Sequence, residues 1–365
     1  MNNPFPGLKW TTILEQIEGK QKSESKLPSW FKTDGIVFPH KISIEQTSSE
    51  ITAAYKTSLI SGESIIDLTG GFGVDAYYFA KRFKRVIHCE MNEELSSIVA
   101  HNFTQLQVNN VKCIPGDSES ILKNMTHRFD WIYVDPSRRN DSKGKVFMLK
   151  DCSPNVPELI DYYLKFSNKI LIKTAPILDI VAGFNELKFV KAIHIVAVDN
   201  EVKELLWEIS AENELPVEIY TVNIKDNNSE YFQFQWTKKE ISPIYSLPKK
   251  YVYEPNSAIM KSGGFDEVSI QFGLGKLHPN SHLYTADELI QFPGRFFTIA
   301  QVIPYQKKEI KTALEGKKAN VTTRNFPETV DQIRKKWKIS DGGELYCFFT
   351  TDLNNNKIVL LCNKM

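Results

Sequence analysis

Acidic residues follow four successive apolar segments in the first half of the chain. They are Asp67, Glu90, Asp117 and Asp135. A single acid in such a place is often a solvated turn residue, but the recurrence at successive segments argues against chance. Because the carboxyl ends of parallel strands meet at one edge of a sheet, we expect these carboxylates to surround one ligand.

A glycine-rich segment follows the first of these acids. Residues 65–75 read as a strand, a glycine-rich turn and the start of a helix. Gly71 and Gly73 let the backbone approach a ligand and adopt positive φ, and with Ala76 they also fit the G-x-G-x-x-A pattern of dinucleotide sites. Carboxylates at Asp67 and Asp75 would repel a pyrophosphate, whereas S-adenosylmethionine offers an ammonium and a sulfonium. The segment therefore favours S-adenosylmethionine, with an NAD-dependent oxidoreductase as an alternative.

The next two acids suit the nucleoside part of such a ligand. Glu90 is placed to bind both ribose hydroxyls, as acids do in NAD enzymes too. Asp117 can accept a hydrogen bond from an adenine amino group. With Thr69 in the glycine-rich loop and Ser118 beside Asp117, these residues complete the predicted cofactor-binding set.

The fourth segment ends in an acid–proline pair followed by two arginines. The predicted catalytic residues are Asp135, Pro136, Arg138 and Arg139. The carboxylate and the backbone carbonyls near the proline would accept hydrogen bonds from an amino group being methylated. The guanidinium groups would fork onto phosphate or stack on bases. The alternative is a turn with surface arginines.

Strand-like and helical segments alternate from about residue 64 to 210. The predicted strands cover 65–68, 86–90, 111–114, 131–134, 169–172, 192–198 and 204–209, with further strands at 217–224 and 231–236. This rhythm predicts an α/β fold, a doubly wound, Rossmann-like sheet of mostly parallel strands. Residues 199–203 are too short for a crossover, so the strands on either side should pair antiparallel.

The segments before and after this sheet have less regular sequence patterns. The first sixty residues read as helical from the spacing of Trp10, Ile13, Leu14 and Ile17, and Thr47 with Glu50 predicts a capping box for the next helix. Residues 237–250 read as a linker rich in proline and lysine. Beyond it we predict a helix at 255–262, short elements to Pro304, a strand at 319–325, a helix at 327–338 with Pro327 in its first turn, and a hairpin of 344–352 with 357–362.

Composition limits the class of protein. Lys and Arg number 45 against 44 Asp and Glu, for a formal charge of +1, so the chain as a whole is not a polybasic binder. No apolar run approaches a membrane span and the start lacks a signal sequence, so we expect a cytoplasmic protein without a membrane partner. The five cysteines (Cys89, Cys113, Cys152, Cys347 and Cys362) read as buried thiols, and Pro279 between His278 and His282 argues against a metal site.

A local basic stretch lies near the C-terminus. Residues 307–338 contain ten Lys or Arg and four acids, a net charge of +6. The ten are Lys307, Lys308, Lys311, Lys317, Lys318, Arg324, Arg334, Lys335, Lys336 and Lys338. The stretch suits delivery of an anionic polymer, and a solvated helix face is the alternative.

Taken together, these motifs resemble class I S-adenosylmethionine-dependent methyltransferases, and more narrowly a bacterial group with a C-terminal THUMP-like domain. Residues 45–50, 201–206 and 325–330 share the resemblance. It implies an N-terminal helical segment at 1–60, a methyltransferase core at 61–236, a ferredoxin-like module at 251–318 and a THUMP-like module at 319–365. It also implies S-adenosylmethionine as cofactor and RNA, either rRNA or tRNA, as substrate. No DNA partner is expected, and the oligomeric state stays open.

The acceptor side departs from known patterns. Arg138 stands where amino-directed base methyltransferases carry an aromatic residue, and the Asp-Pro-Ser-Arg run partly matches enzymes that methylate pyrimidine C5. Those enzymes need a cysteine that residues 170–176 lack, and Cys152 lies one helix earlier, so methylation of nitrogen or ribose oxygen stays open. We expect a base nitrogen, with Asp135 orienting the acceptor and taking its proton and Lys173 helping to hold the substrate. A small-molecule or protein methyltransferase and a non-catalytic RNA-binding protein are the alternatives.

Overall fold

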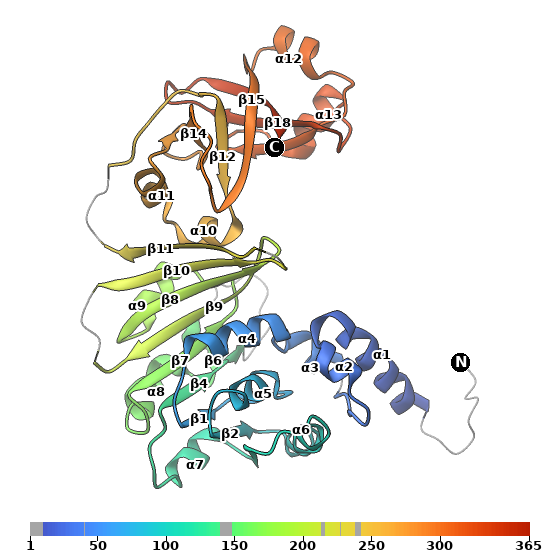
Figure 1. The fold of residues 1–365 in the computed structure, drawn as a ribbon, viewed down its shortest axis with the longest axis vertical. Helices are drawn as coiled ribbons and strands as arrows, with labels where there is room; N and C mark the ends of the chain where they lie inside the picture. The colour runs from blue at the N-terminus through green and yellow to red at the C-terminus, as the bar shows by residue number, and fades with distance from the viewer. Residues whose placement is uncertain (1–9, 40, 139–147, 213–215, 227, 238–241) are drawn as a thin grey trace. The chain divides into compact units, whose positions relative to one another are not determined.

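The computed structural model describes residues 10–39, 41–138, 148–212, 216–226, 228–237 and 242–365 (Figure 1). The chain forms two compact units. The first contains Met1–Val196 and Lys203–Glu218, and the second contains Ala197–Val202 and Ile219–Met365. All the residues predicted to bind cofactor or to act in catalysis belong to the first unit.

The N-terminal segment is helical, as predicted. Its helices are α1 (Trp10–Lys26), α2 (Pro28–Lys32), α3 (Lys41–Gln46) and α4 (Glu50–Leu59). The predicted capping box is wrong, because Ser49 and not Thr47 caps α4, accepting the N–H of Thr52 at 3.2 Å. Glu50 does not reach back to the helix start. Its carboxylate accepts hydrogen bonds from Ser29 and Tyr78, which hold it against the neighbouring elements.

Nine strands form the larger sheet. They are β1 (Ser64–Asp67), β2 (Arg85–Glu90), β3 (Val111–Pro115), β4 (Trp131–Val134), β7 (Lys169–Thr174), β8 (Val190–Val198), β9 (Glu201–Ser210), β10 (Val217–Ile224) and β11 (Glu230–Trp236), in the order β11-β10-β8-β9-β7-β4-β1-β2-β3. The run β3-β2-β1-β4-β7 is parallel, and β9 pairs antiparallel with β7. Asp199 and Asn200, both with positive φ, join the neighbouring strands β8 and β9 as a two-residue hairpin turn. The predicted strand pattern is confirmed.

Short helices connect the parallel strands. They are α5 (Val74–Ala80), α6 (Glu93–Gln105), α7 (Ser118–Lys123), α8 (Val156–Tyr163) and α9 (Ile180–Glu186), with a 3-10 turn η1 (Leu149–Asp151). Two very short strands, β5 (Ser137–Arg138) and β6 (Cys152–Ser153), pair antiparallel beyond β4. Ile65, Ile66 and Ile132 are fully buried, so the central strands are fixed by the core while their carboxyl ends stay available to a ligand.

The second unit contains a seven-stranded sheet. Its strands are β12 (Tyr251–Pro255), β13 (Gly275–Lys276), β14 (Tyr284–Ala286), β15 (Gly294–Pro304), β16 (Asn320–Arg324), β17 (Leu345–Thr351) and β18 (Lys357–Lys364), in the order β13-β14-β12-β15-β18-β17-β16. Its helices are α10 (Ser257–Ser262), α11 (Phe265–Phe272), α12 (Lys307–Leu314) and α13 (Val330–Trp337). The predicted C-terminal hairpin is confirmed as the antiparallel pair β17 and β18.

Two details of this unit differ from the sequence predictions. Pro327 is not in the first turn of α13, because Thr329 caps the helix and forms a capping box with Gln332. A long strand, β15, and the helix α11 occupy the region where only short elements were expected. The glycines and prolines there mark the ends of these elements, since Gly294 and Pro304 bound β15.

The state of the cysteines and the lengths of the helices agree with what the sequence predicts. All five cysteines are free thiols, four of them buried and Cys113 half-buried. Across the described parts of the chain, no helix is both long enough and apolar enough to cross a membrane.

Candidate functional site

A cavity of about 1180 Å³ opens at the carboxyl ends of the parallel strands. Eight of the twelve predicted site residues line it, namely Thr69, Gly71, Asp75, Glu90, Asp117, Ser118, Asp135 and Pro136. Asp67 and Gly73 lie behind the lining residues of the glycine-rich loop. The side chain of Arg138 and the whole of Arg139 lie outside the described residues. The N-terminal segment contributes Gln46, Thr47 and Ser48 to the wall.

The β1–α5 loop is held by Asp67 and Thr69. Asp67 is 1% exposed, and its carboxylate accepts the N–H of Thr69 at 3.0 Å. Burial raises the pKa of Asp67 well above its ordinary value, and the nearby carboxylates of Asp75 and Asp135 raise it further. The hydroxyl of Thr69 in turn accepts the N–H of Asp135 at 2.6 Å. The ends of β1 and β4 are therefore fixed relative to each other.

Gly71 and Gly73 have the positive φ values that the sequence predicts. Gly71 has φ of +53° and Gly73 has φ of +80°, conformations that residues with a side chain rarely adopt. A Cβ atom on Gly73 would also lie 2.7 Å from a methyl group of Val99 on α6. Gly73 therefore permits both the turn and the close approach of the glycine-rich loop to α6.

Glu90 and Asp117 organise the adjacent loops. Glu90 accepts the N–H of Gly71 at 2.9 Å with one carboxylate oxygen and the N–H of Asn92 at 2.8 Å with the other. Asp117 caps α7 by accepting the N–H of Ser120 at 2.8 Å. Both carboxylates are thus held at the cavity edge by backbone groups, where the sequence predicted contacts to a nucleoside.

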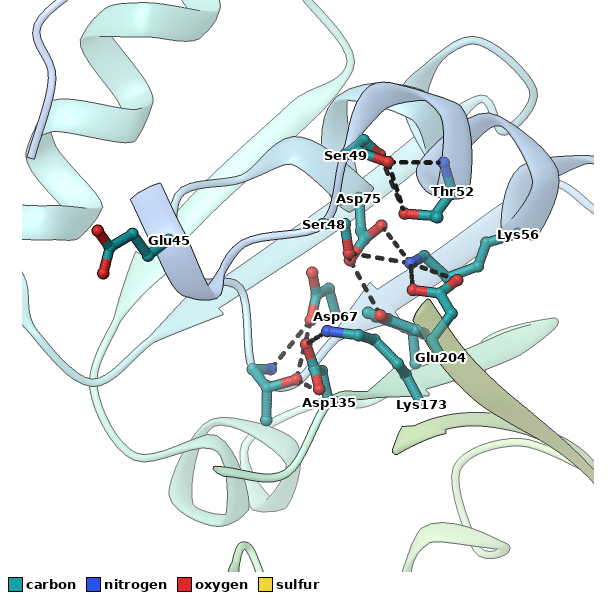
Figure 2. Close-up of polar contacts among 12 residues, drawn as sticks. Glu45, Ser48, Ser49, Thr52, Lys56, Asp67, Asp75, Asp135, Lys173 and Glu204 are labelled. Atoms are coloured by element: carbon teal, nitrogen blue, oxygen red, sulfur yellow. Dashed lines mark hydrogen bonds and ion pairs between the residues drawn. The ribbon is translucent and has the colours of Figure 1, made fainter. Parts of the chain in front are cut away.

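A buried ion network lies behind the cavity (Figure 2). Lys56 on α4 is fully buried, and its ammonium contacts Ser48 at 2.9 Å, Asp75 at 3.1 Å and Glu204 at 2.8 Å. Asp75 also accepts hydrogen bonds from the hydroxyls of Ser48 at 2.8 Å and Tyr133 at 2.9 Å. Although burial alone would raise the pKa of Asp75, the ammonium groups of Lys56 and Lys173 lower it, so this carboxylate stays charged.

A second ion pair joins Lys173 to Asp135 at the cavity itself. The Lys173 side chain is 13% exposed and that of Asp135 is 30% exposed. Burial would lower the pKa of Lys173, but Asp135, Glu204 and Asp75 raise it above its ordinary value, so the amine stays protonated. Lys173 therefore contacts the predicted catalytic carboxylate directly, and its predicted part in holding substrate stays a prediction.

The sequence did not reveal the partners within this network. Segments 45–50 and 201–206 share the resemblance to the methyltransferase family, but the sequence pattern predicts no role for Ser48, Lys56, Tyr133 or Glu204. The available signal was a lysine in the body of the apolar helix α4 and an acid in the buried strand β9. On the acceptor side, β5 and β6 place Ser137 opposite Ser153, next to Pro136 and Pro154 in the cavity wall.

Family models match three parts of the chain. Residues 62–137 match an RNA cap guanine-N2 methyltransferase family, residues 251–293 a ferredoxin-like domain and residues 294–364 a THUMP domain-like family. The boundary between the two C-terminal modules predicted at 318/319 stays a prediction. No curated protein matches the chain.

Solved structures similar to this chain include one that covers its whole length. A candidate methyltransferase from Porphyromonas gingivalis W83 is 34% identical, with all of this chain and 92% of that chain covered and a TM-score of 0.91. An O-methyltransferase from Bacillus cereus in complex with SAH is 10% identical over 55% of this chain and 99% of that chain, with a TM-score of 0.37. A candidate RNA methyltransferase from Pyrococcus horikoshii is 16% identical over 52% and 98%, with a TM-score of 0.34.

Proposed function

We propose that this chain, which belongs to the bacterial class I S-adenosylmethionine-dependent methyltransferases with a C-terminal THUMP-like domain, methylates RNA. The enzyme class and the cofactor follow from the family. RNA as the acceptor is supported by the RNA-directed family model at 62–137 and by the THUMP-like module at 294–364. The cytoplasmic location predicted from the sequence is part of the same proposal.

The cavity fits S-adenosylmethionine in charge and size. Glu90 and Asp117 line it, so carboxylates face a ligand that carries an ammonium and a sulfonium. Its volume of about 1180 Å³ exceeds the roughly 300–1,000 Å³ usual for a site that holds one small molecule. The surplus leaves room for part of an acceptor.

Different residues of the cavity would bind different parts of the cofactor. Glu90, oriented by Gly71 and Asn92, would bind the ribose hydroxyls, and Asp117 with Ser118 would bind the adenine. Asp67 would act indirectly, because the hydrogen bond that it accepts from Thr69 holds the β1–α5 loop in shape. The bound cofactor supplies a methyl group on a sulfonium whose thioether product leaves readily.

The protein's part in the transfer is mainly positioning. Asp135 lies at the cavity with its backbone fixed by Thr69 and its carboxylate fixed by Lys173. It would accept a hydrogen bond from the acceptor group and so aim that group at the methyl carbon. Pro136 and Ser137 continue the same wall.

The basic stretch supports a polyanionic acceptor. Four of its ten cations are used in ion pairs, because Lys311 binds Glu315, Arg324 binds Glu254, Arg334 binds Asp341 and Lys336 binds Glu328. The other six are exposed and form no ion pair with another described residue, namely Lys307, Lys308, Lys317, Lys318, Lys335 and Lys338. These six are the cations available to phosphates, and we call them the free lysines.

A comparison of modified nucleosides tests the proposal. RNA from cells with the gene should contain one methylated nucleoside that is missing, or much reduced, in RNA from cells without it. Restoring the gene should restore the nucleoside. Identical nucleoside profiles in rRNA and tRNA, together with a missing methylated metabolite or protein, would establish the small-molecule or protein alternative instead.

A further inference from the structure

We infer that the acceptor atom is a hydroxyl oxygen, the 2′-hydroxyl of a ribose in RNA, bound jointly by the ammonium of Lys173 and the carboxylate of Asp135. The inference rests on the proposed function, since it takes RNA as the substrate. The 2′-hydroxyl is the free hydroxyl that each internal nucleotide of an RNA chain presents. The base nitrogen predicted from the sequence is the competing acceptor.

The ion pair at the cavity favours oxygen over nitrogen. A neutral amino nitrogen gains positive charge as it forms a bond to the methyl carbon, so its site should offer acceptors without a nearby cation. Asp135 does not meet that condition, because the ammonium of Lys173 contacts its carboxylate. A hydroxyl oxygen becomes more negative as its proton leaves, and a nearby ammonium stabilises that charge.

The buried network supplies negative charge that attracts the ammonium of Lys173. Glu204 is part of that charge, and Lys56 anchors it with contacts of 2.8 and 3.0 Å to its two oxygens. Asp75, also bound to Lys56, adds negative charge on the same side. Lys56 and Glu204 are therefore positioning residues that act through Lys173, whereas Lys173 and Asp135 face the cavity as the catalytic pair.

The described part of the cavity wall gives a base no aromatic surface to stack on at the acceptor side. Enzymes that methylate a base within a strand usually flip it and stack it on aromatic or apolar side chains. Among the described lining residues the one aromatic side chain is Phe72, which comes from the glycine-rich loop and is 2% exposed. The acceptor side is formed by Pro136, Ser137, Pro154, Asn155 and Pro176. A sugar hydroxyl can enter such a site without a flat surface to stack on.

The two side chains divide the work of the transfer. Lys173 donates a hydrogen bond to the hydroxyl oxygen, and Asp135 accepts the hydroxyl proton. The oxygen forms its bond to the methyl carbon as the methyl–sulfur bond breaks, and the electron pair of that bond stays on sulfur. A carboxylate suffices as proton acceptor because the proton becomes strongly acidic as the oxygen binds carbon. Asp135 then releases the proton to water.

The guanine-N2 family match does not decide the acceptor atom. It covers residues 62–137, which include Asp135 and the cofactor half of the cavity. Lys173 and Glu204 lie outside it. The family match therefore does not cover the residues that define the acceptor half of the cavity.

Alkaline hydrolysis of labelled RNA distinguishes the two acceptors. The full-length protein is incubated with RNA from cells lacking the gene and with S-adenosylmethionine carrying a labelled methyl group, and the RNA is then hydrolysed with alkali. A 2′-O-methyl group protects its phosphodiester bond, so we expect the label in alkali-resistant dinucleotides. Label in mononucleotides would overturn the inference and leave RNA methylation intact. RNA without any label would overturn both.

Variants at Lys173 give a second, independent test. Lys173→Met should lower incorporation by about 100-fold or more, the usual effect of removing one charge-stabilising donor. It should change the affinity for S-adenosylhomocysteine, measured by calorimetry, by less than about 3-fold. Lys169→Met, at the other end of β7, is the matched control and should keep wild-type incorporation. Incorporation by Lys173→Met within about 3-fold of wild type would overturn the role of the ammonium.

Discussion

Lys56 on α4 and Glu204 on β9 form a fully buried ion pair of 2.8 Å although 148 residues separate them in the chain. The same ammonium binds Asp75 on α5. One lysine therefore links the N-terminal helices, the first helix after the glycine-rich loop and the antiparallel strand beside β7. The N-terminal segment is a structural part of the catalytic unit, with Ser48 in the cavity wall.

Removing this ammonium should strongly destabilise the first unit. Lys56→Met leaves two buried carboxylates without their cation, which typically costs about 3–5 kcal/mol. Urea unfolding followed by tryptophan fluorescence measures the change in the free energy of unfolding. Lys84→Met is the control, because Lys84 forms an exposed ion pair with Glu63 that should contribute at most about 1 kcal/mol. Equal effects of the two substitutions would contradict the importance given to the buried pair.

Stability should also fall between pH 7 and pH 5. Burial and, to a smaller extent, the nearby charge of Lys191 lower the pKa of His194 from 6.5 to about 4. Between these two pH values the unfolded chain binds a proton that the folded chain does not bind. The contribution of His194 to the free energy of unfolding is therefore complete above pH 6.5 and is lost as the pH falls towards 4. We expect a loss of about 2 kcal/mol from this residue between pH 7 and pH 5.

The His194→Phe variant isolates that contribution. Its free energy of unfolding should depend less on pH over the same range than that of the wild type, with the difference measured by urea unfolding at each pH. His88, whose pKa burial also lowers, should still give the variant some acid sensitivity. Parallel pH profiles for variant and wild type would rule out His194 as a source of the effect.

Cofactor affinity should depend on the acids at the strand ends. Glu90→Ala removes the carboxylate held by Gly71 and Asn92, and we expect S-adenosylhomocysteine to bind about 10-fold more weakly or worse, as for the loss of a charged hydrogen bond. Asp67→Ala should weaken binding as well, by loosening the loop. Glu93→Ala, an exposed acid in the first turn of α6, is the matched control. Tight binding of NAD, with no response to S-adenosylhomocysteine, would refute the assignment.

The free lysines should set the salt dependence of RNA binding. Each phosphate that they neutralise adds a little under one logarithmic unit per decade of salt to the slope. Changing all six to Gln should weaken RNA binding and flatten the slope. The protein with Lys84, Lys188 and Lys191 changed to Gln serves as a control, since these exposed lysines lie in the first unit. Unchanged slopes after the sixfold substitution would favour a solvated helix face.

The sequence predicted what depends on local pattern. The predicted bounds of strand β4 match the observed ones because Trp131–Val134 is a short apolar run that ends at Asp135-Pro136. The positive φ values in the glycine-rich loop were predictable because Gly71 and Gly73 are the residues that adopt them readily. Contacts between distant segments were beyond such patterns. The pairing of Lys56 with Glu204 depends on helix α4 lying against strand β9, and that of Lys173 with Asp135 depends on β7 lying beside β4. The start of α4 was misplaced for a similar reason, since Glu50 binds Ser29 and Tyr78 instead of its own helix.

Transfer of a labelled methyl group to RNA by wild type and by Asp135→Ala tests the account most directly. The wild-type protein should label RNA from cells lacking the gene. Asp135→Ala should label it about 100-fold less or not at all, because the acceptor is no longer oriented, while its calorimetric affinity for S-adenosylhomocysteine stays close to that of wild type. Equal labelling by the two proteins, or no labelling of RNA by the wild type, would contradict an RNA methyltransferase that acts through Asp135.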